Sequence, residues 1–365
     1  MVREKQWVRT LASAVVAALL LAACAGDEDS ESSSGTEADD ADDVGDTGDT
    51  GEGAAEFFEG ETVRIVVVYG EGGAFDLIAR TVAPVVGDYL DADVVVENMP
   101  GAGGLLAMNT VWEEEPDGLT VVFFSGQGVT GAVLGGADGV QFDLLGYEYV
   151  ARMALEPRIL IGALDSEYQS GDDVVGASGL RFASSGPGGS DHIDANVLFE
   201  VLGIDGDIVT GYSGSAETAL AVASGDVDAA SGTLLDRART VTAGDAQPLL
   251  IISDERVDLY PDIPTVLEFE LGEEQRALAE AQLALQGMGY TMLAPPGTPE
   301  DRVQLLTEAF GSAMSDSGVV ERLNEQELVT EGFLEGPGLR DVAESLLNDA
   351  PEAFTEILLR AYDAS

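Results

Sequence analysis

Apolar runs and helical segments alternate along the chain from residue 62 onward. Near-continuous apolar runs of strand length lie at Arg64–Tyr69, Asp93–Glu97 and Leu119–Phe124. Such runs are typical of strands buried on both faces, so they predict a parallel sheet. Apolar residues recur at helical spacing from Phe75 to Tyr89, between the first two runs, and from Leu105 to Trp112, after the second. This alternation predicts βαβ units with right-handed crossovers.

The same alternation returns in a second block. Its predicted strands lie at Arg181–Ser184, Asp207–Thr210, Asp226–Ala230 and Pro248–Ile252. A further strand, Tyr290–Ala294, leads into helical segments that begin near Pro299, Ser317 and Gly338. Because no strand separates these last helices, we expect them to cover the first sheet.

These blocks predict an α/β fold of two lobes joined by two crossover strands, with a ligand cleft between the lobes. Residues 62–160 plus 292–365 form the first, discontinuous lobe in this prediction, and residues 161–291 form the second. The crossover strands are placed near Leu160 and Met292. Ligands of open α/β sheets bind beyond the carboxyl ends of the strands, so the loops that follow the strands are the candidates for chemistry.

The first sixty residues are typical of an exported protein. Arg3, Lys5 and Arg9 precede an apolar run that is too short to span a bilayer comfortably, so residues 1–23 are predicted to be a signal peptide. The run ends at Cys24, as in a bacterial lipobox, which predicts lipidation of this cysteine; the alternative is a free core cysteine. The acidic, Ser- and Gly-rich stretch that follows predicts a solvated, disordered tether over residues 24–61.

The charge balance restricts the function further. The chain of 365 residues has 68 acidic and 16 basic residues, for a net charge of −52. Because nucleic acids and anionic membranes bind clustered cations, neither is an expected partner, and contact with a membrane is expected only through the lipid anchor. One cysteine and one histidine exclude an internal disulfide and the usual His- or Cys-rich metal sites. We expect no cofactor and no metal. The acidity is consistent with selection for solubility or with a saline habitat.

Gly- and Ser-rich loops follow three of the predicted strands. They are Gly70–Asp76, Asn98–Gly104 and Ser184–His192, and each leads into a helix. Small residues and the free N–H groups of a helix start favour an anion; for the first loop, the alternative is that Asp76 only caps its helix. The first loop lacks the third glycine of a dinucleotide fingerprint and the lysine of a P-loop.

Several ordered motifs carry a resemblance to a known family. They are RIVVVYGEGGAFD (64–76), VVENMPGAGG (95–104), Gly188–His192 with Phe199 and Leu202-Gly203, GYSGSA (211–216), DIPTV (262–266) and LAPPGTPEDRV (293–303). In this order they resemble the tripartite tricarboxylate transporter substrate-binding proteins, also called Bug or TctC-type receptors. The resemblance implies a type II periplasmic-binding fold and an extracytoplasmic, lipid-anchored monomer. It also implies capture of a di- or tricarboxylate or related organic acid for a membrane permease, without chemical change.

The resemblance also implies which residues contact the ligand. Carried over by position, they are Tyr69, Gly72, Gly73, Ala74, Phe75 and Asp76 in the first loop; Ser125 after the third strand; Ser184, Ser185, Gly186, Ser190 and His192 in the second lobe; and Tyr212 with Ser213. Two departures from the family pattern affect the ligand class. Phe75 replaces a threonine, which suggests a bulkier ligand unless the ring faces the core. Ser213 replaces a lysine and removes a cation near the cleft.

Two other functions are weighed against the receptor. A hydrolase would need His192 with one of the nearby serines, but none of these lies in a G-x-S-x-G elbow, so we expect no catalytic residues. A surface protein that signals to an envelope partner would use the same ligand-gated closure, and the sequence does not separate it from a transport receptor. Arg80, four residues after Asp76, is expected to pair with it rather than with a ligand.

Overall fold

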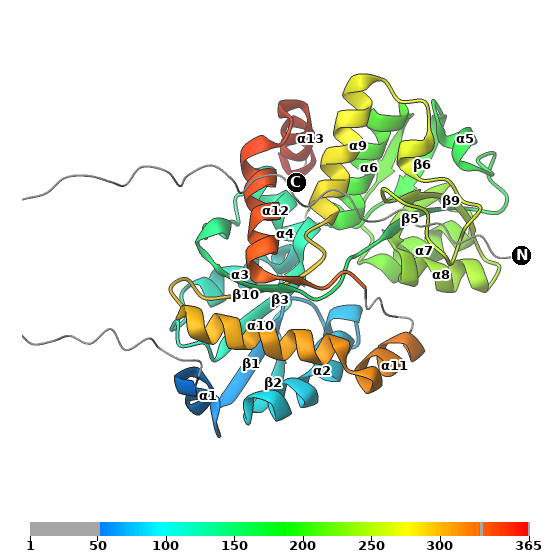
Figure 1. Cartoon of the computed structure of the whole chain (residues 1–365). Helices are drawn as coiled ribbons and strands as arrows, with labels where there is room; N and C mark the ends of the chain where they lie inside the picture. Colours follow the sequence, from blue (N-terminus) through cyan, green and yellow to red (C-terminus); the bar gives the residue numbers. More distant parts are fainter. Residues whose placement is uncertain (1–51, 188, 327, 329–330, 364–365) are drawn as a thin grey trace, which may run out of the picture. The chain divides into compact units, whose positions relative to one another are not determined.

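The computed structural model describes residues 52–187, 189–326, 328 and 331–363. The predicted signal peptide, Cys24 and residues 25–51 of the predicted tether lie outside these ranges. Within them, no helix combines the length and the apolar composition needed to cross a bilayer. Two α/β lobes make up the described part of the chain, each built on one sheet (Figure 1).

The first sheet has six strands and is mixed rather than wholly parallel. Its order is β11 (Leu334–Glu335), β4 (Glu148–Arg152), β10 (Tyr290–Ala294), β3 (Thr120–Ser125), β1 (Thr62–Val67) and β2 (Asp93–Asn98). The predicted parallel pairing of β1 with β2 and β3 is confirmed, with Val66 opposite Glu97 and Val122. Strand β10 runs antiparallel between β3 and β4. Strands β4 and β11 were not predicted from the sequence.

Three helices of the first lobe follow its parallel strands, and two more follow the antiparallel strand β10. They are α2 (Ala74–Leu90), α3 (Leu105–Trp112), α4 (Gly126–Leu134), α10 (Glu300–Ser315) and α11 (Ser317–Glu325), with short 3-10 turns at Ala102–Gly104 and Leu144–Gly146. Helices α10 and α11 both pack on α2, and α10 also packs on β4. The predicted place on the first sheet is confirmed for α10, whereas α11 packs on α2 and α10.

The second lobe holds a five-stranded mixed sheet. Its order is β7 (Asp205–Val209), β6 (Ser178–Ala183), β8 (Ala229–Thr233), β5 (Arg158–Gly162) and β9 (Gln247–Ile252). Its helices are α5 (Gly171–Val174), α6 (Ser190–Leu202), α7 (Ser215–Ala223), α8 (Leu234–Thr242) and α9 (Glu273–Gln286), with a 3-10 turn at Val266–Glu268. Strand β5 runs antiparallel to both neighbours, β8 and β9.

The connections between the lobes differ from the prediction. Leu160 lies inside β5 of the second sheet, opposite Ser231, and Met292 lies inside β10 of the first sheet, opposite Phe123. The chain passes from β4 to β5 through residues 153–157 and returns through residues 287–289, between α9 and β10. The connections therefore lie a few residues before the predicted positions, because the apolar pattern of each strand gives no signal of the sheet to which it pairs.

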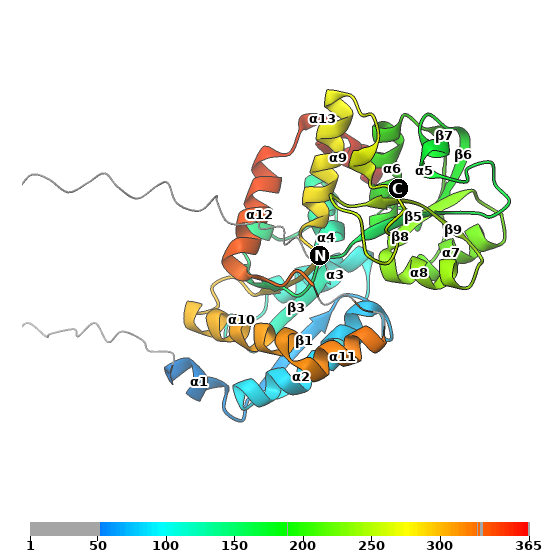
Figure 2. The same ribbon diagram turned by 45° about the vertical axis from the view of Figure 1, so that its right-hand side comes forward.

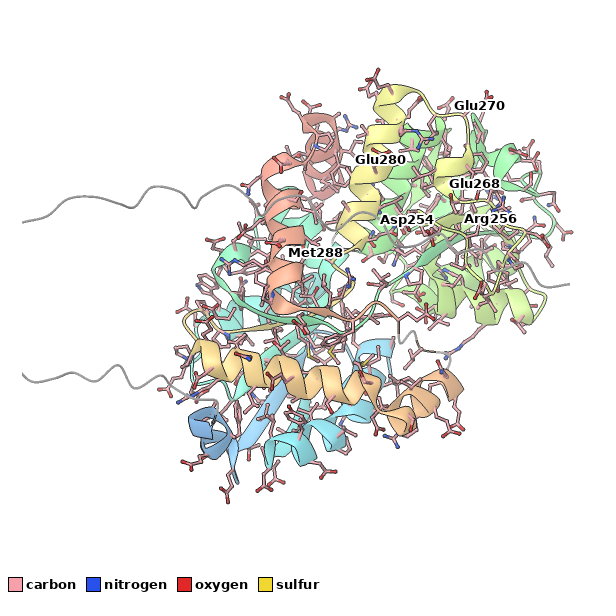
Figure 3. All side chains as sticks on the ribbon, in the orientation of Figure 1. Asp254, Arg256, Glu268, Glu270, Glu280 and Met288 are labelled. Atoms are coloured by element: carbon pink, nitrogen blue, oxygen red, sulfur yellow. The ribbon has the colours of Figure 1, made fainter. Side chains whose placement is uncertain are left out.

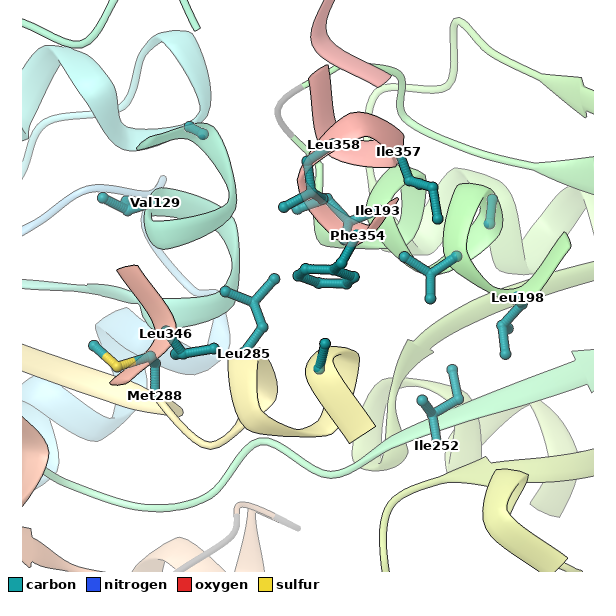
Figure 4. Packing of buried hydrophobic residues seen from close by; sticks show 14 of the residues in the cluster. Val129, Ile193, Leu198, Ile252, Leu285, Met288, Leu346, Phe354, Ile357 and Leu358 are labelled. Carbon is teal, nitrogen blue, oxygen red and sulfur yellow. The ribbon is translucent and has the colours of Figure 1, made fainter. Parts of the chain in front are cut away.

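The last two helices join the lobes rather than covering only the first sheet. Helix α12 (Gly336–Asp349) contacts β4 and α9, and α13 (Glu352–Asp363) contacts α4 of the first lobe and α6 and α9 of the second (Figure 2). One hydrophobic cluster includes residues of both sheets and of these helices. Figure 4 shows the Phe354 ring of α13, which is fully buried, with Leu285 of α9 and Ile193 of α6. A shared core therefore connects the lobes.

The predicted tether is shorter than expected at its C-terminal end. Residues Glu52–Phe58 form helix α1, which contacts α10. The side chain of Phe58 is fully buried, and the guanidinium of Arg302 lies 3.4 Å from the centre of the Phe57 ring. These two aromatic residues supply the apolar surface that fixes a segment whose composition is otherwise that of a solvated linker.

Acidic side chains cover the outer surface of the second lobe. Asp254, Glu270 and Glu280 are exposed there (Figure 3). Arg256 pairs with Glu268 through Nε and Oε1 at 2.7 Å, and both side chains are more than a third exposed. The excess of carboxylates is therefore a feature of the folded surface and not only of the N-terminal stretch.

Candidate functional site

Asp76 organises the first predicted loop. Its Oδ2 accepts a hydrogen bond from the Gly72 N–H at 2.8 Å, and its Oδ1 accepts one from Arg80 Nε at 2.9 Å. Burial alone raises the pKa of the Asp76 carboxyl, but these two bonds outweigh burial and the pKa lies below its usual value. Arg80 also bonds Asn98, whose amide donates to the Tyr69 carbonyl at 3.0 Å. The predicted Asp76–Arg80 pair is present, and Asp76 fixes the loop through it and through Gly72.

Phe75 faces the core of the first lobe. Its ring is 9% exposed and lies 4.6 Å from the ring of Tyr69, 4.7 Å from Tyr290 and 5.1 Å from Phe123, measured between ring centres. Of the two roles left open by the sequence, packing is the one that the structure supports. The ring therefore gives no reason to expect a bulky ligand.

His192 is buried in the second lobe and is engaged by its neighbours. Its Nδ1 lies 2.9 Å from Ser184 Oγ, and the ring also hydrogen-bonds the backbone carbonyl of Ala361 in α13. Burial lowers the pKa of the imidazole, which favours the neutral ring. Ser184 Oγ in turn accepts the Gly186 N–H at 3.0 Å. These contacts connect the loop to α13 through His192.

The rest of the second loop is shaped by Asp191. Its carboxylate accepts hydrogen bonds from the Ser185 N–H at 2.7 Å and from Ser185 Oγ at 2.5 Å. Asp191 occupies the first turn of α6, where a carboxylate also interacts favourably with the helix dipole. The loop is therefore held in one shape by its own side chains, as the first loop is by Asp76.

Three predicted residues from the two lobes meet at Gly128, on the first turn of α4. A methyl group placed on Gly128 would lie 3.6 Å from Ser190 Oγ, 3.8 Å from the Tyr69 hydroxyl oxygen and 3.9 Å from Ser125 Cβ. The neighbouring Gln127 side chain donates to the Ser190 carbonyl at 3.4 Å. The structure thus brings the start of α4 in the first lobe to the start of α6 in the second. Gly128 was missed by the sequence reasoning, since a glycine within an apolar helix gives no signal.

A buried ionic cluster adjoins this point and was also missed. Arg158, at the start of β5, bonds Asp194 through Nε at 2.6 Å and Glu156 through Nη1 at 3.4 Å. Asp194 Oδ1 accepts further bonds from Gln127 at 2.9 Å and Gln282 at 2.8 Å. The cluster contains groups from α4, β5, α6 and α9. The sequence signal was the pair of charges around Pro157, set between two apolar runs.

Tyr212 and Ser213 lie apart from this meeting point. Tyr212 packs against the apolar cluster on the other face of the second sheet. Ser213 donates through its N–H and its Oγ to Glu217 at 2.6 and 2.7 Å, on the first turn of α7. Their described contacts stay within the second lobe.

No described group of three or more His, Cys, Asp or Glu side chains has the arrangement of a metal site. A groove of about 900 Å³ lies elsewhere, along α2 and the edge strand β2. Among the predicted residues, none contributes to the lining of that groove. The groups at the meeting point are hydroxyls and the starts of two helices.

Two α/β lobes, with predicted site residues contributed by both, define a two-lobed solute-binding protein. The model of the tripartite tricarboxylate transporter family receptor matches residues 78–331. A UPF0065 protein of Bordetella pertussis is 28% identical over 275 residues, which cover 74% of this chain and 81% of that protein. BugT, also of Bordetella pertussis, is 23% identical over 281 residues, or 75% of this chain and 82% of BugT.

Solved structures share the fold. The periplasmic binding protein BugD superposes with a TM-score of 0.64 at 22% identity, covering 81% of this chain and 97% of BugD. MatC of Rhodopseudomonas palustris, solved with bound malate, has a TM-score of 0.63 at 24% identity and covers 82% of this chain and 99% of MatC. The chain belongs to the tripartite tricarboxylate transporter receptor family. It is an extracytoplasmic solute-binding receptor and not an enzyme, as the sequence predicted.

Proposed function

We propose that this receptor captures an organic acid, a di- or tricarboxylate or a related compound, between its two lobes. The observation that carries the proposal is the meeting of Tyr69 and Ser125 of the first lobe with Ser190 of the second at Gly128. Two similar folds support the chemistry: MatC was solved with malate, and a second R. palustris protein, Rpa4515, with adipate.

The arrangement suits a carboxylate even though the chain is acidic. Helices α4 and α6 both begin at the meeting point, and the positive end of a helix dipole favours an anion there. Some of their first N–H groups already have partners: the Gly128 N–H donates to Ser125 Oγ, and the His192 N–H donates to Asp191. The hydroxyls of Tyr69, Ser125 and Ser190 add hydrogen-bonding groups without a formal charge.

A thermal-shift screen tests this binding. Residues 24–365 with Cys24→Ser are titrated with malate, adipate, citrate and benzoate. A ligand that binds only the folded state adds about 2.7 kcal/mol at a hundredfold excess over Kd. A rise in Tm with at least one acid is expected, and no rise with any of them would contradict the proposal.

Gly128 offers a matched variant for the same screen. Gly128→Ala should fold, because its methyl group has ordinary contact distances to its neighbours. That methyl group occupies the meeting point, so the shift with the bound acid should decrease while the ligand-free Tm stays close to that of the parent. An unchanged shift would place the ligand elsewhere.

We further propose that the receptor is anchored by lipid on Cys24, acts as a monomer and delivers its solute to a membrane permease of the tripartite type. The family match supports the permease as partner, and the lipobox-like end of the apolar run supports the anchor. Cys24→Ser should move the full chain from the membrane fraction to the soluble fraction. Light scattering should give a monomer mass. Unchanged fractionation or a dimer mass would refute the respective claim.

A further inference from the structure

A buried carboxylate lies directly next to the proposed binding point. Glu156 Oε2 accepts a hydrogen bond from Ser125 Oγ at 3.0 Å, and the Glu156 side chain is only 5% exposed. Ser125 also hydrogen-bonds Tyr69. Two of the three side chains that meet at Gly128 are therefore connected to one carboxylate by one or two hydrogen bonds.

The charges around Glu156 do not balance. The groups that face it are Arg158 on β5, Asp194 on α6, Asp236 on α8, and the phenols of Tyr69, after β1, and Tyr290, on β10. Arg237, fully buried on α8, also interacts with Asp236 and Asp194. With all three carboxylates ionised, two guanidiniums therefore face three negative charges. Arg158 makes its shorter contact with Asp194, at 2.6 Å, and its longer one with Glu156, at 3.4 Å. Glu156 is therefore the less well compensated carboxylate of that buried pair.

An anion that enters beside this cluster adds to its excess of negative charge, and repulsion is strong where water is excluded. Protonation of Glu156 relieves that repulsion most readily, since Asp194 already accepts hydrogen bonds from Arg158, Gln127 and Gln282. Burial already raises the pKa of the Glu156 carboxyl to about 7, against the attraction of Arg158. A small additional negative potential is enough to change its protonation near neutral pH.

We propose that capture of an anionic solute is accompanied by uptake of one proton from solvent onto Glu156. The protonated carboxyl then donates its O–H to Ser125 Oγ, which leaves the Ser125 hydroxyl proton available to the carboxylate of the solute. Glu156 thereby acts as a positioning residue for Ser125. The inference rests on the proposed capture of an organic acid at this site.

Isothermal titration calorimetry tests the coupling. Malate and adipate are each titrated into residues 24–365 with Cys24→Ser, at pH 7.5, in phosphate and in Tris, which differ in ionisation enthalpy. The apparent binding enthalpy should differ between the two buffers. The difference should equal the number of protons taken up multiplied by the difference between the ionisation enthalpies of the buffers. The Kd should rise with pH above 7, by up to about tenfold per unit for a single coupled proton.

Two variants separate the role of Glu156 from that of carboxylates in general. In Glu156→Gln the buffer dependence and the rise of Kd with pH should disappear while binding remains. Glu280→Gln, a change at an exposed carboxylate of α9 (Figure 3), should keep both. If Glu156→Gln does not fold, infrared difference spectra of the parent with and without malate or adipate replace it, and a gain of the protonated-carboxyl C=O band is expected.

The outcomes distinguish the two proposals. Binding of either acid with the same enthalpy in both buffers, or without the carboxyl band, overturns the coupling and leaves the proposed capture intact. Buffer dependence that persists in Glu156→Gln also overturns it, because the proton then goes to another group. If neither acid binds and no acid raises Tm in the thermal-shift screen, both the proposed function and the coupling are overturned.

Discussion

Replacing Glu156 by glutamine in the solute-free protein should make it more stable at pH 8 and leave the stability at pH 4.5 nearly unchanged. Burial raises the pKa of this carboxyl from 4.5 to about 7 in the folded state, while the unfolded chain keeps the ordinary value. The folded state therefore holds the proton more tightly. Its stabilising effect is fully present below pH 4.5 and is lost as the pH rises to about 7.

The size of the effect follows from the same shift. A difference of about 2.5 pH units, at 1.36 kcal/mol per unit, corresponds to roughly 3 kcal/mol between the two ends of this window. Because the side chain is 5% exposed, solvent screening reduces this value little. Glutamine is neutral at every pH and is nearly the same size, so the variant lacks this contribution to the pH dependence.

Urea unfolding of the parent and of Glu156→Gln at intervals between pH 4.5 and 8 measures the difference directly. The free energy of unfolding of the variant should exceed that of the parent increasingly across this range, and the difference should level off above pH 7. A difference that is constant with pH would show that Glu156 is already ionised throughout. A variant that is less stable at pH 8 would show that the contact with Arg158 outweighs burial.

Three further predictions concern packing and the surface. Gly126→Ala should destabilise the fold by about 1–3 kcal/mol in urea unfolding, because its methyl group would lie 2.3 Å from Met288 Cβ; a wild-type midpoint would contradict this packing. Phe354→Ala should lower the free energy of unfolding by about 3–5 kcal/mol, whereas Leu359→Ala, on an exposed part of the same helix, should lower it far less. Equal losses in the two variants would refute a buried role for α13. Arg256→Ala removes an exposed ion pair and should change stability by less than about 1 kcal/mol at 0.15 M salt, so a larger loss would show that this pair is more than a surface contact.

Local patterns in the sequence were sufficient for most of the fold. The strand at residues 290–294 was predicted with its observed bounds, and the first two βα units follow the expected order. Strand β4 was missed because Glu148 and Arg152, at its ends, interrupt the apolar pattern. Strand β5 was expected as a crossover between the lobes near Leu160, but it pairs only within the second sheet, since pairing with β8 and β9 is a long-range property that no local pattern encodes.

The candidate site was predictable to a smaller extent. Tyr69, Ser125 and Ser190 all lie close to Gly128, because motifs at strand ends converge in an α/β fold. Their contact with a ligand stays a prediction. Phe75 and His192 face the interior, and the sequence could not show this because the direction of a side chain at the start of a helix depends on its tertiary neighbours. The Glu156 cluster is assembled from four elements distant in the sequence, so only the fold reveals it.

Helix α13 has a consequence for biosynthesis. Its buried side chains belong to the core that both lobes share, and its Ala361 carbonyl binds His192 in the second loop. The first lobe is likewise incomplete without β10, α10 and α11, which come after the whole of the second lobe in the chain. Since contacts of such long sequence separation form slowly, neither lobe can complete its packing until the end of the chain has emerged. The predicted signal peptide would direct the chain across a membrane, and this delay would keep the chain unfolded during its passage.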